Sequence, residues 1–190
     1  MYSFHRVILS CSIAISVTLK FTSAMAGQDA IENCYNDPHF YCINDPAVTQ
    51  AITSIDNIVV YQGDRVWLRA GGCVQTGGHG STWKRYVNPS GPNSYILYHG
   101  EIQIPGAVET MTFLNYLVGD DGSWSRMWTI GVADPNFFPG TINIGYTDDG
   151  YDDNGYYAHD NGTGDQCNGV GNAWLQIYIC RADPAHGATC

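Results

Sequence analysis

From about residue 57 onward, apolar and polar residues alternate in short runs, which is the period of a β-strand with one buried face. Valine, isoleucine, tyrosine and tryptophan dominate these runs, and glycine, asparagine, aspartate and proline separate them. The predicted strands cover residues 58–61, 65–70, 95–98, 101–104, 110–114, 127–132, 141–146 and 174–180. Residues 46–55 are compatible with one short helix. We therefore predict an all-β fold built from two packed antiparallel sheets.

A different pattern occupies residues 1–26. His5 and Arg6 precede an apolar stretch from residue 7 to residue 17, and residues 24–26 read Ala-Met-Ala, the small-x-small form of a signal-peptidase site. We predict that this segment is a signal peptide and that the protein is secreted to the extracellular space or the periplasm. The rest of the sequence has no apolar run near the roughly 20 residues that a membrane-spanning helix needs.

The exported part divides into a polar lead-in, residues 27–56, and a predicted sandwich domain, residues 57–190. The lead-in carries two Asn-Asp-Pro triplets, at residues 36–38 and 44–46, which favour turns, and we expect a Cys34–Cys42 bridge to close a small loop around the first of them. An even number of cysteines in an exported chain indicates up to three disulfides, whose other pairings stay open. The cysteines concerned are Cys34, Cys42, Cys73, Cys167, Cys180 and Cys190.

Acidic residues outnumber basic ones, with 18 Asp and Glu against 8 Lys and Arg and a formal net charge of -10. Removing the predicted leader deletes Arg6 and Lys20 and makes the exported chain more acidic still. Such a surface repels phosphate backbones, so the composition argues against a nucleic-acid partner. Divalent cations are its natural counter-charge.

Two segments interrupt the strand pattern because they are long and rich in glycine. They span residues 71–80 and residues 147–172, and the second has almost no aliphatic residues. Loops longer than about 12–15 residues in a compact domain are usually functional or disordered. We predict that these Gly/Asp-rich loops lie together at one end of the sandwich and carry the function.

The second segment places six aspartates between Asp148 and Asp165, with no lysine or arginine among them. Like charges this close are unfavourable unless a cation screens them or they project into water. Carboxylate, amide and carbonyl oxygens in a Gly-rich loop suit Ca²⁺, which takes about six to eight oxygen ligands. The spacing does not match an EF-hand, so the loop must be of another design. The alternative is a solvated acidic hairpin without a metal.

Aromatic rings and hydrogen-bonding groups are interleaved in both Gly-rich segments. A pyranose presents apolar C–H faces to aromatic rings and vicinal hydroxyls to acceptors or to a metal. On this chemistry alone we predict sugar contacts from Gln75, His79, Tyr157 and His159. The competing interpretation is that each histidine is an ordinary surface residue.

Three stretches resemble the small bacterial calcium-dependent galactose-binding lectins of the PA-I galactophilic type. They are residues 63–73, Gly-Asp-Arg-Val-Trp-Leu-Arg-Ala-Gly-Gly-Cys, residues 141–148, Thr-Ile-Asn-Ile-Gly-Tyr-Thr-Asp, and residues 160–164, Asp-Asn-Gly-Thr-Gly. The resemblance covers roughly residues 57–179. It implies a jelly-roll-like, galactose-binding-like β-sandwich with one Ca²⁺ at the loop end, where the ion coordinates two sugar hydroxyls.

In that family the ion is held by an Asp after the penultimate strand, by an adjacent pair of Asn and by backbone carbonyls. The resemblance implies Asp148 at the first position, Asp160 and Asn161 at the paired positions, and a carbonyl from Thr76 or a neighbour. The spacing from Asp148 to Asp160 is longer than the family uses. Asp153, in the inserted stretch, is therefore a further candidate ligand for the same ion or for a second one.

The expected function is that of a secreted calcium-dependent lectin for galactose-type glycans, without catalytic residues. A glycosidase is one alternative, although the only Glu residues after the leader are Glu32, Glu101 and Glu109 and the aspartates cluster in one segment. A secreted adhesin or toxin subunit with purely structural calcium is another. Single lectin sites bind sugars weakly, so avidity favours a homo-oligomer.

Overall fold

The structure is a computed structural model that describes residue 34 and residues 36–77, 81–119, 122–131 and 139–190. The predicted signal peptide and His79 lie outside these residues. None of the helices in the described part of the chain combines the length and the hydrophobicity that crossing a bilayer requires.

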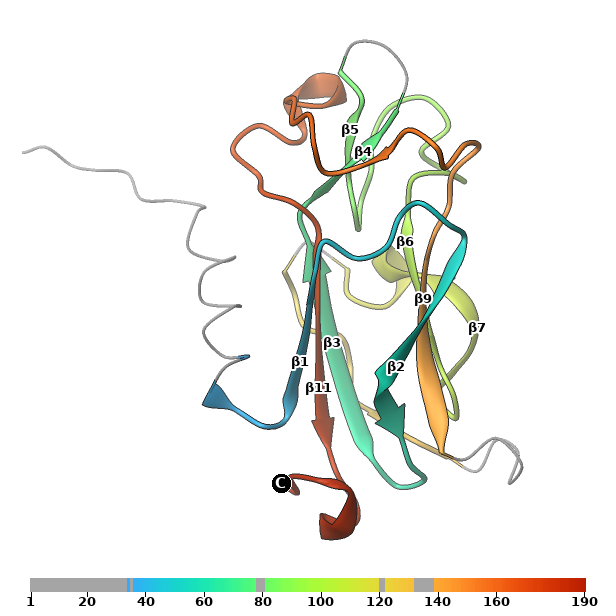
Figure 1. Cartoon of the computed structure of the whole chain (residues 1–190), viewed down its shortest axis with the longest axis vertical. Coiled ribbons are helices and arrows are strands. Elements are labelled where there is room, and N and C mark those ends of the chain that lie inside the picture. The colour runs from blue at the N-terminus through green and yellow to red at the C-terminus, as the bar shows by residue number, and fades with distance from the viewer. Residues whose placement is uncertain (1–33, 35, 78–80, 120–121, 132–138) are drawn as a thin grey trace, which may run out of the picture.

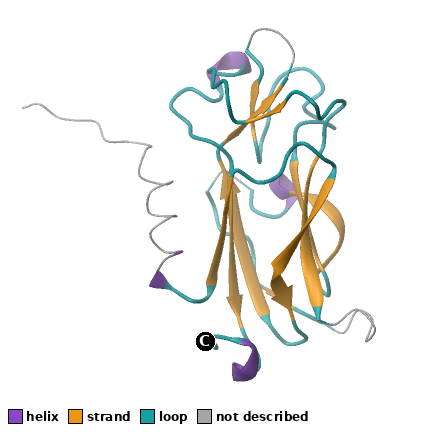
Figure 2. Cartoon of the chain, in the orientation of Figure 1, coloured by secondary structure: helices purple, strands orange, loops and turns teal. Residues whose placement is uncertain are grey.

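Two four-stranded antiparallel sheets enclose a common core (Figure 1, Figure 2). Sheet A has the order β1 (Phe40–Asn44), β11 (Trp174–Cys180), β3 (Arg65–Gly71) and β8 (Trp128–Thr129). Sheet B has the order β2 (Ile52–Val60), β9 (Gly140–Tyr146), β6 (Gly100–Ile104) and β7 (Val108–Phe113). The described residues also contain the 3-10 turns η1 (Leu114–Tyr116), η2 (Thr163–Asp165) and η3 (Pro184–His186). The predicted all-β sandwich is confirmed.

The core forms because alternate residues of each strand point into the space between the sheets. In β3, Val66, Leu68 and Ala70 are fully buried while the residues between them reach the surface. In β9, Ile142 and Ile144 do the same from the opposite sheet. Burying a Val, Leu or Ile side chain contributes about 1.5–3 kcal/mol relative to leaving it exposed, so the two strands anchor their sheets to each other.

Two predicted elements are wrong. Residues 46–51 form no helix, and residues 52–60 form strand β2, which pairs with β9. Residues 95–98, predicted as a strand, form a turn in which Tyr98 has a φ of 71°, in the left-handed region that strands do not contain. Both segments are short, and in each the tertiary environment outweighed a weak local pattern.

A third, small sheet joins the two Gly-rich segments, which had been predicted as separate loops. Its order is β10 (Asn154–Gly155), β4 (Cys73–Thr76) and β5 (Trp83–Arg85). The buried Cys73–Cys167 disulfide connects the same two segments. This sheet lies at one end of the sandwich, at the top of Figure 1. The prediction that the Gly/Asp-rich segments share one end is therefore confirmed.

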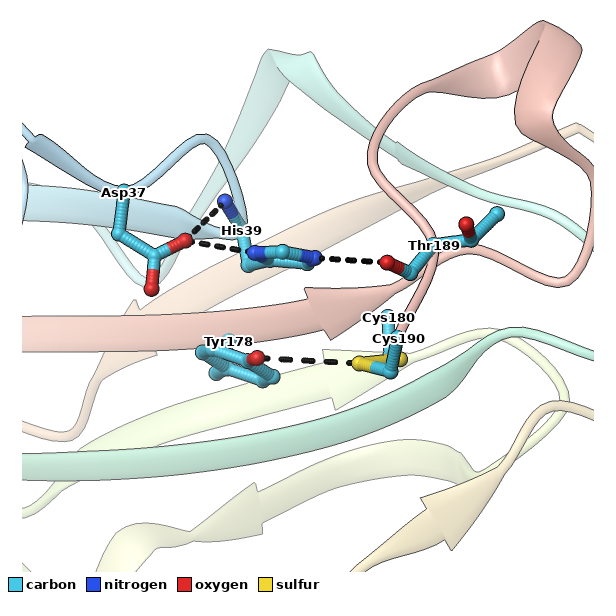
Figure 3. A network of polar contacts seen from close by, with 6 residues as sticks. All are labelled: Asp37, His39, Tyr178, Cys180, Thr189 and Cys190. Atoms are coloured by element: carbon cyan, nitrogen blue, oxygen red, sulfur yellow. Dashed lines mark hydrogen bonds and ion pairs between the residues drawn. A yellow bond between two sulfur atoms is a disulfide. The ribbon is translucent and has the colours of Figure 1, made fainter.

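All six predicted cysteines form disulfides, and the expected Cys34–Cys42 bridge is one of them. Cys180–Cys190 holds the C-terminal segment against sheet A (Figure 3). Beside it, the Nδ1 atom of His39 is 2.6 Å from Oδ1 of Asp37, and its Nε2 atom is 3.3 Å from the carbonyl oxygen of Thr189. These contacts tie the start of the described chain to its end.

Candidate functional site

The end of β9 and the short strand β10 bring several predicted ligands together. Asp148 lies two residues after the end of β9, and the chain then turns back so that Asn154 of β10 pairs with Thr76 of β4. Asp153 precedes Asn154 and lies against Gly77, whose φ is +72° and where a Cβ atom would fall 1.9 Å from the carboxyl carbon of Asp153. A glycine is required there. Asp148, Asp153, Asn154 and the backbone after β4 thus form one polar cluster.

Two oxygen acceptors in this cluster are buried without a hydrogen-bond donor. Asp148 accepts a hydrogen bond at Oδ1 from the backbone N–H of Asp149 at 2.7 Å, but its Oδ2 atom has no partner. Asn154 is 3% exposed; its Nδ2 donates to the carbonyl oxygen of Val48 at 2.9 Å, and its Oδ1 has no partner. Buried acceptors are normally satisfied, because leaving one unpaired costs about 1–3 kcal/mol. A bound cation would satisfy both oxygens.

The electrostatics of Asp148 agree with this. Burial raises the pKa of the Asp148 carboxyl to about 6, although the side chain of Asn154 and the backbone N–H groups of Asp149 and Gly150 partly offset that rise. The dependence of this pKa on Asn154 also shows that the two side chains lie close together. A half-buried carboxylate with a raised pKa favours a positive partner.

This raised pKa predicts a pH-dependent stability difference in calcium-free buffer. A group whose folded-state pKa lies above its unfolded value stabilises the fold at low pH and loses that contribution as the pH rises through the folded pKa. We expect Asp148→Asn to exceed the wild type in melting temperature by an amount that grows from about pH 4, near the unfolded-state pKa, and levels off above the folded pKa of about 6. Calorimetric scans across this range measure the difference, and one that stayed flat or shrank would contradict it.

Asp160, a predicted ligand, has both carboxylate oxygens engaged by the protein backbone. They accept hydrogen bonds from the N–H groups of Thr82 at 2.8 Å, Trp83 at 3.2 Å and Gly162 at 2.6 Å. Burial by itself raises the pKa of Asp160, but these hydrogen bonds together lower it by more, so the pKa lies below its usual value. Asp160 therefore joins its segment to β5, and the adjacent Asn161 is exposed.

The predicted sugar contacts separate into two groups. Tyr157 is 72% exposed and its hydroxyl donates to the carbonyl oxygen of Asp153 at 3.3 Å, which places it beside the polar cluster. Gln75 lies on β4 and accepts a hydrogen bond from the N–H of Ala158 at 3.2 Å. His159 instead packs against Trp83, with ring centroids 4.2 Å apart. Tyr157 and Gln75 thus border the cluster more directly than His159 does.

Sequence reasoning gave no role to Tyr98 and Lys84. Burial is the main cause of the raised pKa of Tyr98, and the negative charges of Asp149, Asp148 and Asp153 raise it as well. The Tyr98 ring therefore lies beside the acidic segment. The buried Lys84 ammonium lies 5.2 Å from the centre of that ring and donates to the carbonyl oxygen of Ser90 at 2.9 Å. No local signal marks either residue, because their positions depend on how the turn after β5 folds back onto the acidic segment.

Within the described residues, no group of three or more His, Cys, Asp or Glu side chains is arranged to hold a metal. The oxygens at Asp148 and Asn154 are one carboxylate and one amide, a combination that suits a hard cation with additional carbonyl ligands.

Comparison with known proteins adds little to this geometry. No protein-family model and no curated protein matches the sequence. A solved structure described as "EclA N-terminal domain; PllA-like lectin" is similar to the chain with a TM-score of 0.40 and 13% sequence identity, covering 74% of this chain and 94% of that one. A likeness of this size carries no weight for the site or its chemistry.

Proposed function

We propose that the protein is a secreted calcium-dependent lectin that binds galactose-type glycans at the Asp148 cluster. The observation that carries the proposal is the pair of buried, unpartnered oxygens, Asp148 Oδ2 and Asn154 Oδ1. Two buried acceptors without a donor would supply two of the roughly six to eight oxygens that Ca²⁺ takes.

The ligands that we propose for Ca²⁺ are the side chains of Asp148, Asp153 and Asn154 and a backbone carbonyl from Thr76, which faces Asn154 in the β4–β10 pairing. This ligand set has Asn154 in place of Asp160 and Asn161, because the carboxylate of Asp160 already accepts hydrogen bonds from the backbone at the start of β5. When bound, the ion supplies positive charge and coordination positions for sugar hydroxyls.

Residues bordering the cluster supply the remaining sugar contacts. The exposed ring of Tyr157 offers a face for the apolar side of a pyranose. Gln75 on β4, whose Oε1 accepts the hydrogen bond from Ala158, offers its Nε2 group as a donor to a sugar hydroxyl. The nearby Cys73–Cys167 disulfide and the Asp160 hydrogen bonds hold these segments in place, which lowers the entropic cost of binding.

A binding protein fits this arrangement better than an enzyme. Glu101 and Glu109, the carboxylates considered for a glycosidase, lie on β6 and β7 of sheet B, outside the segments that form the cluster. Glu109 accepts a hydrogen bond from the N–H of Gly106 at 3.1 Å, which gives it a turn-stabilising role.

Galactose-agarose chromatography with and without EDTA tests the proposal. We expect the wild type to be retained in Ca²⁺ and released by EDTA, and Asp148→Asn to pass through, because the variant lacks the anionic ligand. Asp165→Asn is the matched control: Asp165 is exposed, lies in the same segment and has a φ of 57°, which asparagine tolerates. We expect it to behave as the wild type.

A glycan array in the same buffers extends the test beyond galactose. Retention in EDTA, equal losses in both variants, or a Ca²⁺-dependent rise in melting temperature without binding to any glycan would contradict calcium-mediated recognition. Release of chromophore from a panel of aryl glycosides would contradict the assignment as a non-enzyme.

A further inference from the structure

The outer surface of sheet A carries aromatic and cationic residues where a solvent-facing sheet normally carries mixed polar ones. Phe40, Tyr178 and Trp67 face one another across β1, β11 and β3. Arg65 and Arg69 flank Trp67 on the same side of β3. The three strands contain no acidic residue, although the whole chain has a net charge of -10. The three strands are therefore a local exception to the acidic character of the protein, with one carboxylate, that of Asp37, paired with His39 at the edge of this surface.

On this surface the indole ring of Trp174 packs over Gly71 of the neighbouring strand. Trp174 pairs with Gly71 of β3, where a Cβ atom would fall 2.9 Å from Cζ2 of the indole. The guanidinium carbon of Arg69 is 5.8 Å from the Trp174 ring centre and 4.8 Å from that of Trp124, which is 41% exposed. Two indoles thus flank one guanidinium at the surface, the arrangement of a cation–π contact.

Covalent and polar contacts immobilise the surrounding residues. The Cys34–Cys42 disulfide covers Gln176, whose Nε2 donates to both sulfurs, at 3.2 Å and 3.1 Å, and whose Oε1 accepts from Nε of Arg69 at 2.6 Å. His39 stacks on Tyr178 with ring centroids 5.1 Å apart, beside the second disulfide of this face (Figure 3). Side chains held in this way lose little conformational entropy when a ligand binds.

We propose that this surface, the aromatic–arginine face (Arg65, Trp67, Arg69, Trp124, Trp174 and Tyr178), binds an acidic oligosaccharide without calcium. Indole faces take the apolar sides of pyranose rings, and guanidinium groups pair with the carboxylates of uronic acid units. On this face aromatic rings alternate with arginines, and the face lacks the aliphatic residues that a hydrophobic dimer interface contains. The face belongs to sheet A, whereas the Asp148 cluster follows β9 of sheet B, so this site goes beyond the proposed lectin function.

Titration calorimetry with a galacturonate hexamer in EDTA tests the proposal. We expect the wild type to bind, Trp124→Ala to bind about tenfold more weakly because one stacking surface is lost, and Arg65→Gln to weaken binding and reduce its salt dependence. Tyr116→Ala is the control, because Tyr116 is a 74% exposed aromatic next to sheet B. Trp174→Phe keeps a ring on Gly71, so we expect it to retain most of the affinity.

Asp148→Asn separates this site from the calcium site, and we expect it to bind the hexamer as the wild type does. The proposal is overturned if the hexamer fails to bind in EDTA, if Asp148→Asn abolishes binding, or if Tyr116→Ala weakens it as much as Trp124→Ala. It is also overturned if a thymidine oligonucleotide binds more tightly than the hexamer, or if sedimentation shows a dimer that Trp124→Ala dissociates, since the face then serves a different ligand or a second copy of the chain.

Discussion

Replacing Arg181 by methionine is expected to lower the free energy of unfolding by about 3–5 kcal/mol, because it leaves a buried carboxylate without its cation. Arg181 is 7% exposed and its Nη1 atom lies 2.7 Å from Oδ2 of Asp64, which is fully buried. The same guanidinium donates to the carbonyl oxygen of Val59 at 2.7 Å and to the hydroxyl of Tyr41 at 2.9 Å. One side chain therefore connects both sheets and the C-terminal segment.

Urea denaturation monitored by tryptophan fluorescence, under oxidising conditions, measures this loss. Arg126→Met is the control, because Arg126 is exposed and its change should stay within about 0.5 kcal/mol. The double variant Asp64→Asn, Arg181→Met should recover part of the loss, since it removes the unpaired charge. A loss for Arg181→Met no larger than that of the control would show that Asp64 is stabilised by other groups.

Replacing Asp148 or Asn154 by alanine is expected to weaken Ca²⁺ binding strongly. For Asp148→Ala we expect about a 100-fold loss of affinity, on the order of 2.7 kcal/mol, because a charged ligand leaves the site. Asn154→Ala should cost less, about tenfold, because the lost amide oxygen is neutral. The reason in both cases is that these two side chains hold the unpartnered oxygens of the cluster.

Titration calorimetry with Ca²⁺, and Tb³⁺ luminescence excited through the nearby tyrosines, follow this change directly. A misfolded variant is recognised by its melting temperature: without calcium, Asp148→Ala should be no less stable at pH 7 than the wild type, because it removes a half-buried charge. Unchanged affinity in Asp148→Ala would remove Asp148 from the ligand set. Unchanged Ca²⁺ affinity in Asn154→Ala would remove Asn154 from the ligand set and favour Asp160 and Asn161 as ligands.

Strand periodicity identified most of the sandwich. Residues 65–70, 141–146 and 174–180 were predicted as strands from their β-branched and aromatic residues, and they correspond to β3, β9 and β11. Burial alternates along β3 and the first part of β9, whereas β11, in the middle of its sheet, is buried at most positions. The strand β10, only two residues long, was missed, since it has no period of its own and exists through its pairing with β4. Residues 95–98 show the opposite error, where a local run of β-formers became a turn.

The candidate site was only partly predictable. Asp148 was predicted as a ligand through the family resemblance, which places an Asp just after the penultimate strand, and it stays a proposed ligand. Asp153 and Thr76 were also among the predicted ligands, but Asn154 was not, and the six aspartates of the segment are equivalent in sequence until the fold decides which carboxylates the backbone uses. In the structure, the backbone N–H groups of Thr82, Trp83 and Gly162 donate hydrogen bonds to Asp160, whereas Oδ2 of Asp148 has no hydrogen-bond partner.

The sequence by itself determined the all-β class, the acidic charge, the set of disulfide cysteines and the two Gly-rich segments, because composition and short-range periodicity are local properties. Only the tertiary structure decided that Cys73 pairs with Cys167 across 94 residues, that β4 and β10 align Thr76 with Asn154, and that aromatic residues gather outside sheet A. Each of these depends on the register of strands far apart in the chain, and register is set by the mutual burial of many side chains, which no local pattern contains.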